Sequence, residues 1–180
     1  MGAGVITHVA FLRAMNTGRR RVTNADLVTA VEALGFGGVT TYQASGNLLI
    51  SDEPAMAGPA IAERIGKGLS ERLGYEVPTI VRTADEVQAI AEAAPFDGEP
   101  PRPECTPQVI LLAVPPSSPA IVAAFSDADD QLDLVGSDIH WRPSAGVSTS
   151  ELDVRTLEAA VGTMTVRTHG TLCRIADRLS

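Results

Sequence analysis

The order of apolar and amphipathic segments in the first 82 residues constrains the fold more than any other feature of this chain. A mostly apolar run over 5–12 is typical of a strand buried on both faces. The segments that follow indicate a capped helix, a hairpin, a second helix and a further strand, over 23–34, 39–51, 54–73 and 77–82. This order, βαββαβ, predicts a ferredoxin-like α+β fold.

The rest of the chain follows the same pattern less closely. Five prolines between 95 and 107 indicate a linker, and a capped helix is expected just before it, over 83–94. Further strands and helices are expected at 108–114, 118–125, 132–135, 139–142, 151–161, 164–167 and 171–179. We therefore expect a ferredoxin-like subdomain with a linking helix over 1–94, a Pro-rich linker over 95–107 and a second, related two-layer subdomain over 108–180. No repeat in the sequence itself supports an exact duplication.

Composition and charge limit the classes of function. No stretch approaches the roughly 18 apolar residues that cross a bilayer, and the first residues lack the pattern of a signal peptide. We therefore expect a cytoplasmic protein without a membrane partner. A net charge of −8 argues against nucleic acid as a partner. Cys105 and Cys173 lack metal-ligand spacing, and no zinc or nucleotide-binding motif is present, so we expect neither a metal nor a cofactor.

Topology brings two polar segments to one edge of the first sheet. A right-handed crossover makes the first two strands parallel, and the hairpin then returns the third strand beside the first. The loop after the first strand should thus lie beside the hairpin turn, with Arg82 at the opposite edge. The candidate site residues at this edge are Arg13, Asn16, Gly18, Ser45, Gly46 and Asn47. The loop leads into a helix N-terminus, where free backbone N–H groups favour an anion. Together with the guanidinium, amide and hydroxyl groups of the candidate residues, it would suit a phosphate or a carboxylate.

Structural roles for the same residues remain open. Asn16 and Asn47 can satisfy turn backbones, and 45–47 is also an ordinary hairpin turn. Arg13 is the hardest to explain in this way, because it ends an apolar strand, where an unpaired charge would be costly. A buried ion pair with an acidic residue of the second half is the alternative for Arg13.

The three histidines differ in what their positions suggest. His8 lies inside the first strand, and His140 lies in the second hairpin beside Trp141, where packing roles are expected. His169 precedes the last helix and is the histidine that we consider for acid–base chemistry. Tyr42 is a second candidate proton carrier.

Short motifs along nearly the whole chain resemble one bacterial family. They are Phe-Leu-Arg-Ala-Met-Asn-Thr-Gly at 11–18, Leu-Gly-Phe at 34–36, Thr-Tyr at 41–42, Ser-Gly-Asn at 45–47, Val-Arg-Thr at 81–83, Pro-Phe at 95–96, Leu-Val-Gly at 134–136, Gly146 with Ser150, and Thr-Val-Arg at 165–167 with Thr171 and Leu172. In these motifs the chain resembles the bacterial domain-of-unknown-function family numbered 1697. The resemblance implies paired ferredoxin-like subdomains and no particular activity.

The chain departs from this family in one segment of the candidate site. Where the family usually has Arg-Asn-Trp-Asn-Thr, this chain has Arg167, Thr168, His169, Gly170 and Thr171. A glycine usually stands at the position of Ala14, and a lysine is common at that of Glu151. If the family shares a reaction, these changes predict that this member has lost or altered it. If the site is structural, the changes are drift.

Three functions follow from these features. The leading hypothesis is a module that binds a small phosphate- or carboxylate-bearing ligand between the two halves. Its ligand-binding residues would be Arg13, Asn16, Gly18, Ser45, Gly46, Asn47, Arg167 and Thr171. The second is a small cofactor-free enzyme that uses His169 or Tyr42 for proton transfer. The third, which we rank last, is an RNA-binding module, because the strands offer only Phe11 and Tyr42 for stacking on bases.

Overall fold

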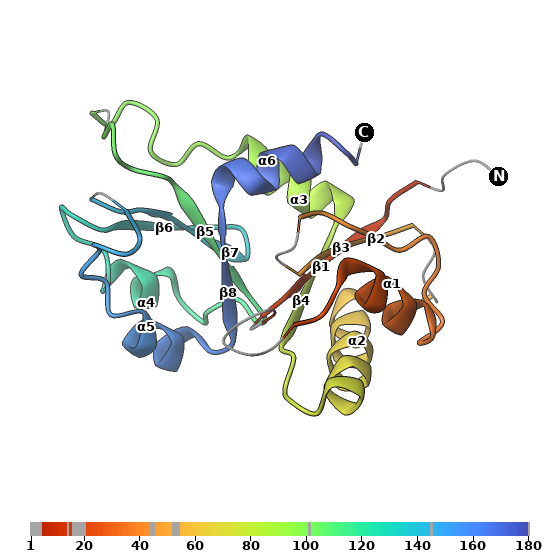
Figure 1. The fold of residues 1–180 in the computed structure, drawn as a ribbon. Helices are drawn as coiled ribbons and strands as arrows, with labels where there is room; N and C mark the ends of the chain where they lie inside the picture. Colours follow the sequence, from red (N-terminus) through yellow and green to blue (C-terminus); the bar gives the residue numbers. More distant parts are fainter. Residues whose placement is uncertain are drawn as a thin grey trace. The chain divides into compact units, whose positions relative to one another are not determined.

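The computed structural model describes residues 5–13, 15, 21–43, 46–51, 55–100, 102–144 and 146–179. The chain divides into two compact units, the first formed by residues 1–87 with 175–180 and the second by residues 88–174. Each unit carries a four-stranded antiparallel sheet with helices packed on it, which confirms the predicted α+β fold class (Figure 1). No helix in the described ranges is both long and apolar enough to cross a membrane.

The first unit has the predicted βαββαβ order. Its elements are β1 (His8–Leu12), α1 (Asn24–Glu32), β2 (Thr40–Thr41), β3 (Asn47–Ile50), α2 (Gly58–Leu73) and β4 (Thr79–Thr83). The strand order is β2-β3-β1-β4, with β1 antiparallel to both β3 and β4. Thr23 caps α1 as predicted, because its Oγ1 accepts the Asp26 N–H at 3.1 Å. Helices α1 and α2 share one core with the sheet (Figure 1).

The core of the first unit forms where the sheet meets these two helices. On α2, Ile61, Ile65 and Leu69 are fully buried, as their four-residue spacing predicts. The glycines of α2 lower its helix propensity, but at least one of them allows close packing. A Cβ atom on Gly68 would lie 2.4 Å from Leu34 Cδ2, so the glycine makes room for the neighbouring helix end.

The second unit repeats this topology. Its elements are the end of α3 (Ala84–Glu92), β5 (Gln108–Leu112), α4 (Pro119–Ala123), β6 (Gln131–Val135), β7 (Asp138–Arg142), α5 (Val154–Val161), β8 (Met164–Thr168) and the start of α6 (His169–Ala176). The strand order, β6-β7-β5-β8, matches that of the first sheet. Helix α6 begins at His169, two residues earlier than expected, because Thr168 Oγ1 accepts the Thr171 N–H at 3.1 Å and caps the helix.

Residues of the two sheets can be matched by their register. Each central strand carries a valine at its second position, with one cross-strand partner on either side. The matched trios are Val9 with Leu49 and Arg82, and Val109 with His140 and Arg167. Both arginines lie in a Val-Arg-Thr triplet, at 81–83 and 166–168, and each donates from Nη1 to the carbonyl of the preceding valine, at 2.9 and 2.8 Å. His140 therefore takes the position that Leu49 holds in the first unit.

Candidate functional site

The sheet edge predicted from topology is present in the first unit. The Leu12 N–H donates to the Gly46 carbonyl at 2.7 Å, so the end of β1 lies beside the hairpin turn. Arg13 follows Leu12 directly and is half-buried. Arg82 pairs with Val9 near the other end of β1, at the opposite edge as expected. The described residues thus bring Arg13 and Gly46 together.

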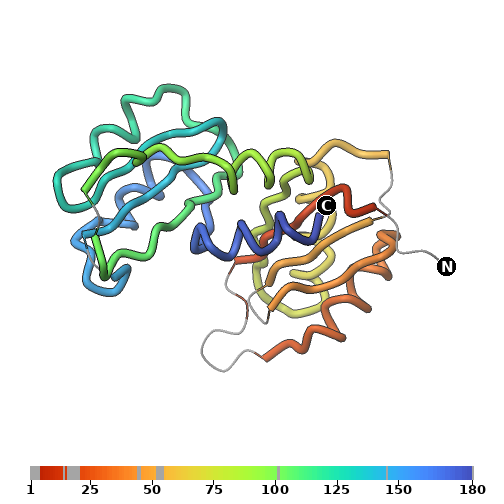
Figure 2. Tube along the Cα trace, turned by 90° about the horizontal axis from the view of Figure 1, so that it is seen from above, coloured from red at the N-terminus to blue at the C-terminus, as the bar shows by residue number. Residues whose placement is uncertain are grey.

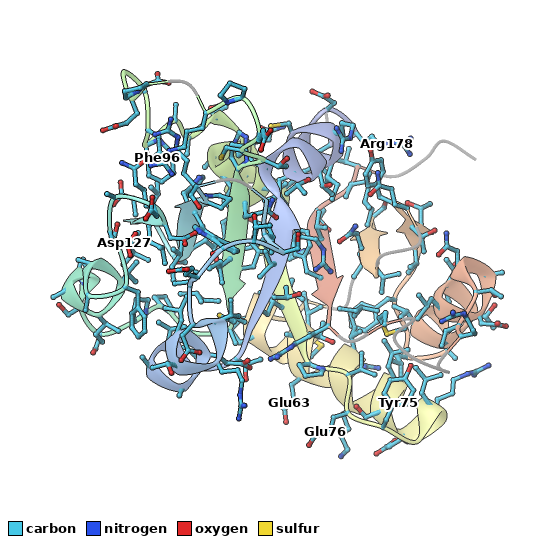
Figure 3. The ribbon with its side chains drawn as sticks, turned by 60° about the vertical axis from the view of Figure 1, so that its left-hand side comes forward. Glu63, Tyr75, Glu76, Phe96, Asp127 and Arg178 are labelled. Atoms are coloured by element: carbon cyan, nitrogen blue, oxygen red, sulfur yellow. The ribbon has the colours of Figure 1, made fainter. Side chains whose placement is uncertain are left out.

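Asn47 has a structural role at this edge. Its side chain is fully buried, and its Nδ2 donates to the Tyr42 carbonyl at 3.1 Å within the hairpin. Tyr42 is also buried, and the Arg178 guanidinium lies 4.9 Å from the centre of its ring; Figure 3 labels this arginine. The other three candidates at this edge lie outside the described residues: Asn16, Gly18 and Ser45.

Arg167 and Thr171, the remaining candidates, belong to the second unit. The Arg167 Nη1 donates to Thr165 Oγ1 at 2.9 Å, and burial lowers the pKa of its guanidinium to about 10, so the group stays charged at neutral pH. By register, Arg167 is the counterpart of Arg82 and not of Arg13. A site that Arg167 shares with Arg13 stays a prediction.

The second unit contains a cavity of about 270 Å³ that the sequence did not predict. Its apolar wall consists of Ala93, Ala94, Pro95, Phe96 and Pro107. Its polar lining consists of Asp97, Gln108, His140, Arg142 and His169. Phe96 stands on the segment that follows α3 (Figure 3). An apolar wall with a few polar groups is typical of a small-molecule site.

His140 is the most unusual group in this lining. It is 3% exposed, and its Nε2 has no hydrogen-bond partner among the described residues. Burial, and secondarily the charge that His169 can carry, lower the pKa of the His140 imidazole, which is therefore neutral at pH 7. A buried polar atom without a partner costs about 1–3 kcal/mol of stability. The sequence predicted a packing role, and the unpaired buried nitrogen adds a reason to look for a partner that the described residues do not supply.

His169 shares the cavity with His140. The centres of the two rings lie 6.0 Å apart, and their planes are inclined by 55°. Cys173, one turn along α6, places its Sγ 3.7 Å from His169 Nδ1 and 3.9 Å from Nε2. His169 is half-buried with polar neighbours, which is the environment that the acid–base hypothesis requires. Within the described part of the chain, no group of three or more His, Cys, Asp or Glu is arranged to hold a metal.

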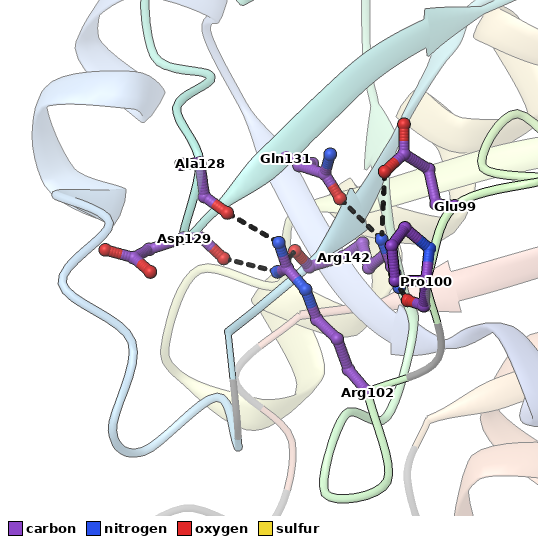
Figure 4. Close-up of polar contacts among 7 residues, drawn as sticks. All are labelled: Glu99, Pro100, Arg102, Ala128, Asp129, Gln131 and Arg142. Atoms are coloured by element: carbon purple, nitrogen blue, oxygen red, sulfur yellow. Dashed lines mark hydrogen bonds and ion pairs between the residues drawn. The ribbon is translucent and has the colours of Figure 1, made fainter.

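Residues 95–100 and 102–107 of the Pro-rich segment, together called the strap, lie along the second unit (light green in Figure 2) and contribute to the cavity wall. Arg102 fastens the strap, because its guanidinium donates to the carbonyls of Asp129 at 2.6 Å, Ala128 at 2.5 Å and Arg142 at 3.3 Å (Figure 4). The segment expected as a linker thus belongs to one unit. The division into subdomains over 1–94 and 108–180 stays a prediction.

Arg142 fastens the strap from β7. Its Nη1 donates to Gln131 Oε1 at 2.7 Å and lies 3.8 Å from Glu99 Oε2, and its Nη2 donates to the Pro100 carbonyl (Figure 4). Glu99 therefore partly balances the charge of Arg142, and Pro100 and Gln131 occupy two of its five N–H donors. The main role of the Arg142 guanidinium is therefore to hold the strap in place at the cavity wall, and its positive charge is partly balanced.

Comparison with known proteins agrees with this architecture. The family described as "Protein of unknown function (DUF1697)" matches residues 5–140. The structure is similar to that of the conserved bacterial protein SP0830 from Streptococcus pneumoniae, with a TM-score of 0.73 and 17% sequence identity over 97% of this chain and 98% of that chain. At this identity the likeness shows the fold alone. No curated protein matches the chain significantly.

Proposed function

The chain belongs to the DUF1697 family of proteins of unknown function, and we propose that this member binds a small anionic molecule in the cavity of its second unit. The observation that carries the proposal is His140, a buried histidine in the cavity lining whose Nε2 has no partner among the described residues. A ligand group that bonds to Nε2 would offset the cost of burying it, and such a ligand would stabilise the folded protein by mass action.

The first unit indicates that packing alone does not require this histidine. Leu49, at the matched position of the first sheet, is 2% exposed. A leucine at position 140 would avoid the desolvation cost of an unpaired nitrogen, about 1–3 kcal/mol. A polar group that lines a cavity at a cost to stability is typical of a binding site.

The polar lining favours an anion over a cation. His169 brings an N–H donor to the cavity, Arg142 keeps N–H groups beyond those bonded to Gln131 and Pro100, and His140 donates from Nε2 in one of its two neutral tautomers. Asp97, the only acid in the described lining, is exposed to solvent, where its charge is screened. A carboxylate or a phosphate would therefore find more donors than acceptors here.

Thermal-shift and calorimetric titrations with acetate, benzoate and inorganic phosphate test the proposal. A probe that binds should stabilise the wild-type protein, by about 2.7 kcal/mol at one hundred times its dissociation constant. The variant His140→Leu should stay folded and lose this effect. Equal stabilisation of both proteins would place the binding elsewhere, and no stabilisation by any probe would contradict the proposal.

The edge of the first sheet is the alternative location for an anion site. Arg13 lies there beside the hairpin turn, and the sequence predicts that it joins Arg167 around the ligand. The variant Arg13→Gln separates the two locations, because it should leave probe binding unchanged if the cavity is the site. Strong loss of binding in Arg13→Gln with normal binding in His140→Leu would favour the sheet edge.

A cytoplasmic location for the protein, expected from the sequence, is part of the same proposal.

Proton transfer by His169 is a second candidate function. The 6.0 Å between the two imidazole centres and the Cys173 sulfur beside His169 favour it, because they give the imidazole neighbours that can hold or pass a proton. Incubation with phenylpyruvate in deuterated water, followed by NMR, would detect exchange at the carbon next to the carbonyl. Acceleration over the uncatalysed rate that is lost in His169→Gln would support this activity, and exchange at the uncatalysed rate in the wild-type protein would count against it.

A further inference from the structure

We infer that the ligand is a small monocarboxylic acid, taken into the cavity as its anion together with one proton that the His140–His169 pair holds. This inference rests on the proposed function and names the ligand class and the way in which its charge is balanced. It follows from three properties of the cavity: its size and wall, the charges in its lining, and the spacing of its two imidazoles.

The size and wall of the cavity suit an acid with an apolar body. The volume of about 270 Å³ limits the occupant to a small molecule. Pro95, Phe96 and Pro107 offer flat apolar surfaces to its body. A phosphate dianion would need several free donors at once, whereas a carboxylate with an aromatic or aliphatic body can use both the wall and the few donors present.

The charges in the lining leave a bound carboxylate only partly compensated. Glu99 lies 3.8 Å from Arg142 Nη1 and partly balances its charge, and two of the five N–H groups of Arg142 bond to Pro100 and Gln131. Asp97 lies at a solvent-exposed position, where its charge is screened, and offers no compensation. Among the described lining residues, the two histidines are the groups that can become positive near neutral pH. A carboxylate that enters the cavity therefore favours protonation of the pair.

The spacing of the imidazoles limits the uptake to one proton. With ring centres 6.0 Å apart in a partly desolvated cavity, two imidazolium ions would repel each other. Among the described residues, several charged and titratable groups surround the pair. They are Asp133 on β6, Asp138 and Arg142 on β7, Arg167 on β8 beyond Val109, Cys173 on α6, and Asp97 on the strap. Burial keeps the His140 imidazole neutral at pH 7, since it lowers the pKa of His140 more than the nearby acids raise it. The negative charge of a bound carboxylate favours the protonated form of an imidazole, and it therefore opposes the effect of burial.

Isothermal titration calorimetry with benzoate in Tris and in Bis-Tris measures the proton uptake directly, because the two cationic buffers differ in ionisation enthalpy and do not compete for an anion site. We expect uptake of up to one proton per benzoate and, in the pH range where the uptake is complete, an affinity that rises by about tenfold per unit fall in pH. The neutral isostere benzamide should bind without proton uptake. His8→Gln removes an imidazole outside the cavity and should change nothing, whereas His140→Leu combined with His169→Gln should abolish the uptake.

The outcomes separate this inference from the proposed function. Benzoate binding with no proton uptake would overturn the inference and leave the proposed function standing. Binding of inorganic phosphate in preference to benzoate would also overturn it, because the ligand class would be wrong. Failure of acetate, benzoate and phosphate alike to bind would overturn both. Uptake that persists in the double histidine variant would show that another group holds the proton.

Discussion

His140 and Leu49 occupy the same position in two sheets that share one topology. Each is the cross-strand partner of the valine at the second position of its central strand. Each is almost fully buried, at 3% and 2% exposed. One fold therefore carries an aliphatic side chain at this position in one unit and a titratable side chain in the other, and the first unit provides the reference for testing what the imidazole does.

The variant His140→Leu should be as stable as the wild-type protein or more stable, by about 1 kcal/mol, because it removes a buried nitrogen without a partner among the described residues. Urea denaturation at pH 7 measures the difference. The reciprocal variant Leu49→His is the control, and it should lose about 2–4 kcal/mol, since it buries a polar ring at a position that packs a leucine. A large loss of stability in His140→Leu would show that the imidazole is needed for the fold.

The stability of the wild-type protein should fall as the pH falls through about 6.5, the ordinary pKa of histidine. Burial and His169 lower the pKa of His140 in the folded protein. Below pH 6.5, the unfolded chain therefore binds a proton that the folded chain resists, so the free energy of unfolding decreases until the pH reaches the lowered value. Urea titrations between about pH 8 and pH 5.5 should show a shallower decrease in His140→Leu. Equal slopes for the two proteins would contradict the assignment.

The parts of the fold that the sequence predicted are those with local signals. The spacing of Ile61, Ile65 and Leu69 predicts α2, and the hydroxyl of Thr23 predicts the start of α1. The approach of Arg13 to Gly46 follows from the right-handed crossover, which is a rule of chain topology and needs no side-chain detail.

The cavity could not be predicted because it depends on contacts between distant segments. Five prolines indicate extended backbone over 95–107 but give no sign of the two arginines that hold it to the second unit. An unpaired nitrogen on His140 likewise follows from packing around the whole cavity. The correspondence of Arg167 with Arg82, in contrast, can be read from the sequence. Each arginine is the middle residue of a Val-Arg-Thr triplet, at 81–83 and 166–168.

The variant Gly46→Ala should lose about 2–3 kcal/mol of stability. Gly46 has φ of 73°, and a Cβ atom would lie 3.0 Å from both Leu12 Cβ and Met15 Cγ, so strain and overpacking combine. Gly74→Ala is the matched control, because φ is 75° there and no other atom lies within 4 Å of the added Cβ. It should lose only about 1 kcal/mol, the cost of the left-handed backbone. Equal losses in urea denaturation would mean that close packing at Gly46 contributes nothing.

The variant Arg102→Gln should loosen the strap. Arg102 donates to three backbone carbonyls of the second unit, and its replacement leaves most of these acceptors without the charged donor. We expect faster cleavage by proteinase K between 95 and 107, a loss of about 1–2 kcal/mol in the free energy of unfolding, and weaker binding of benzoate. Arg155→Gln, at an exposed position on α5, removes the same charge and is the control. Unchanged cleavage in Arg102→Gln would show that the strap is held by its other contacts, of which the bonds from Arg142 to Pro100 and Glu99 are the first to test.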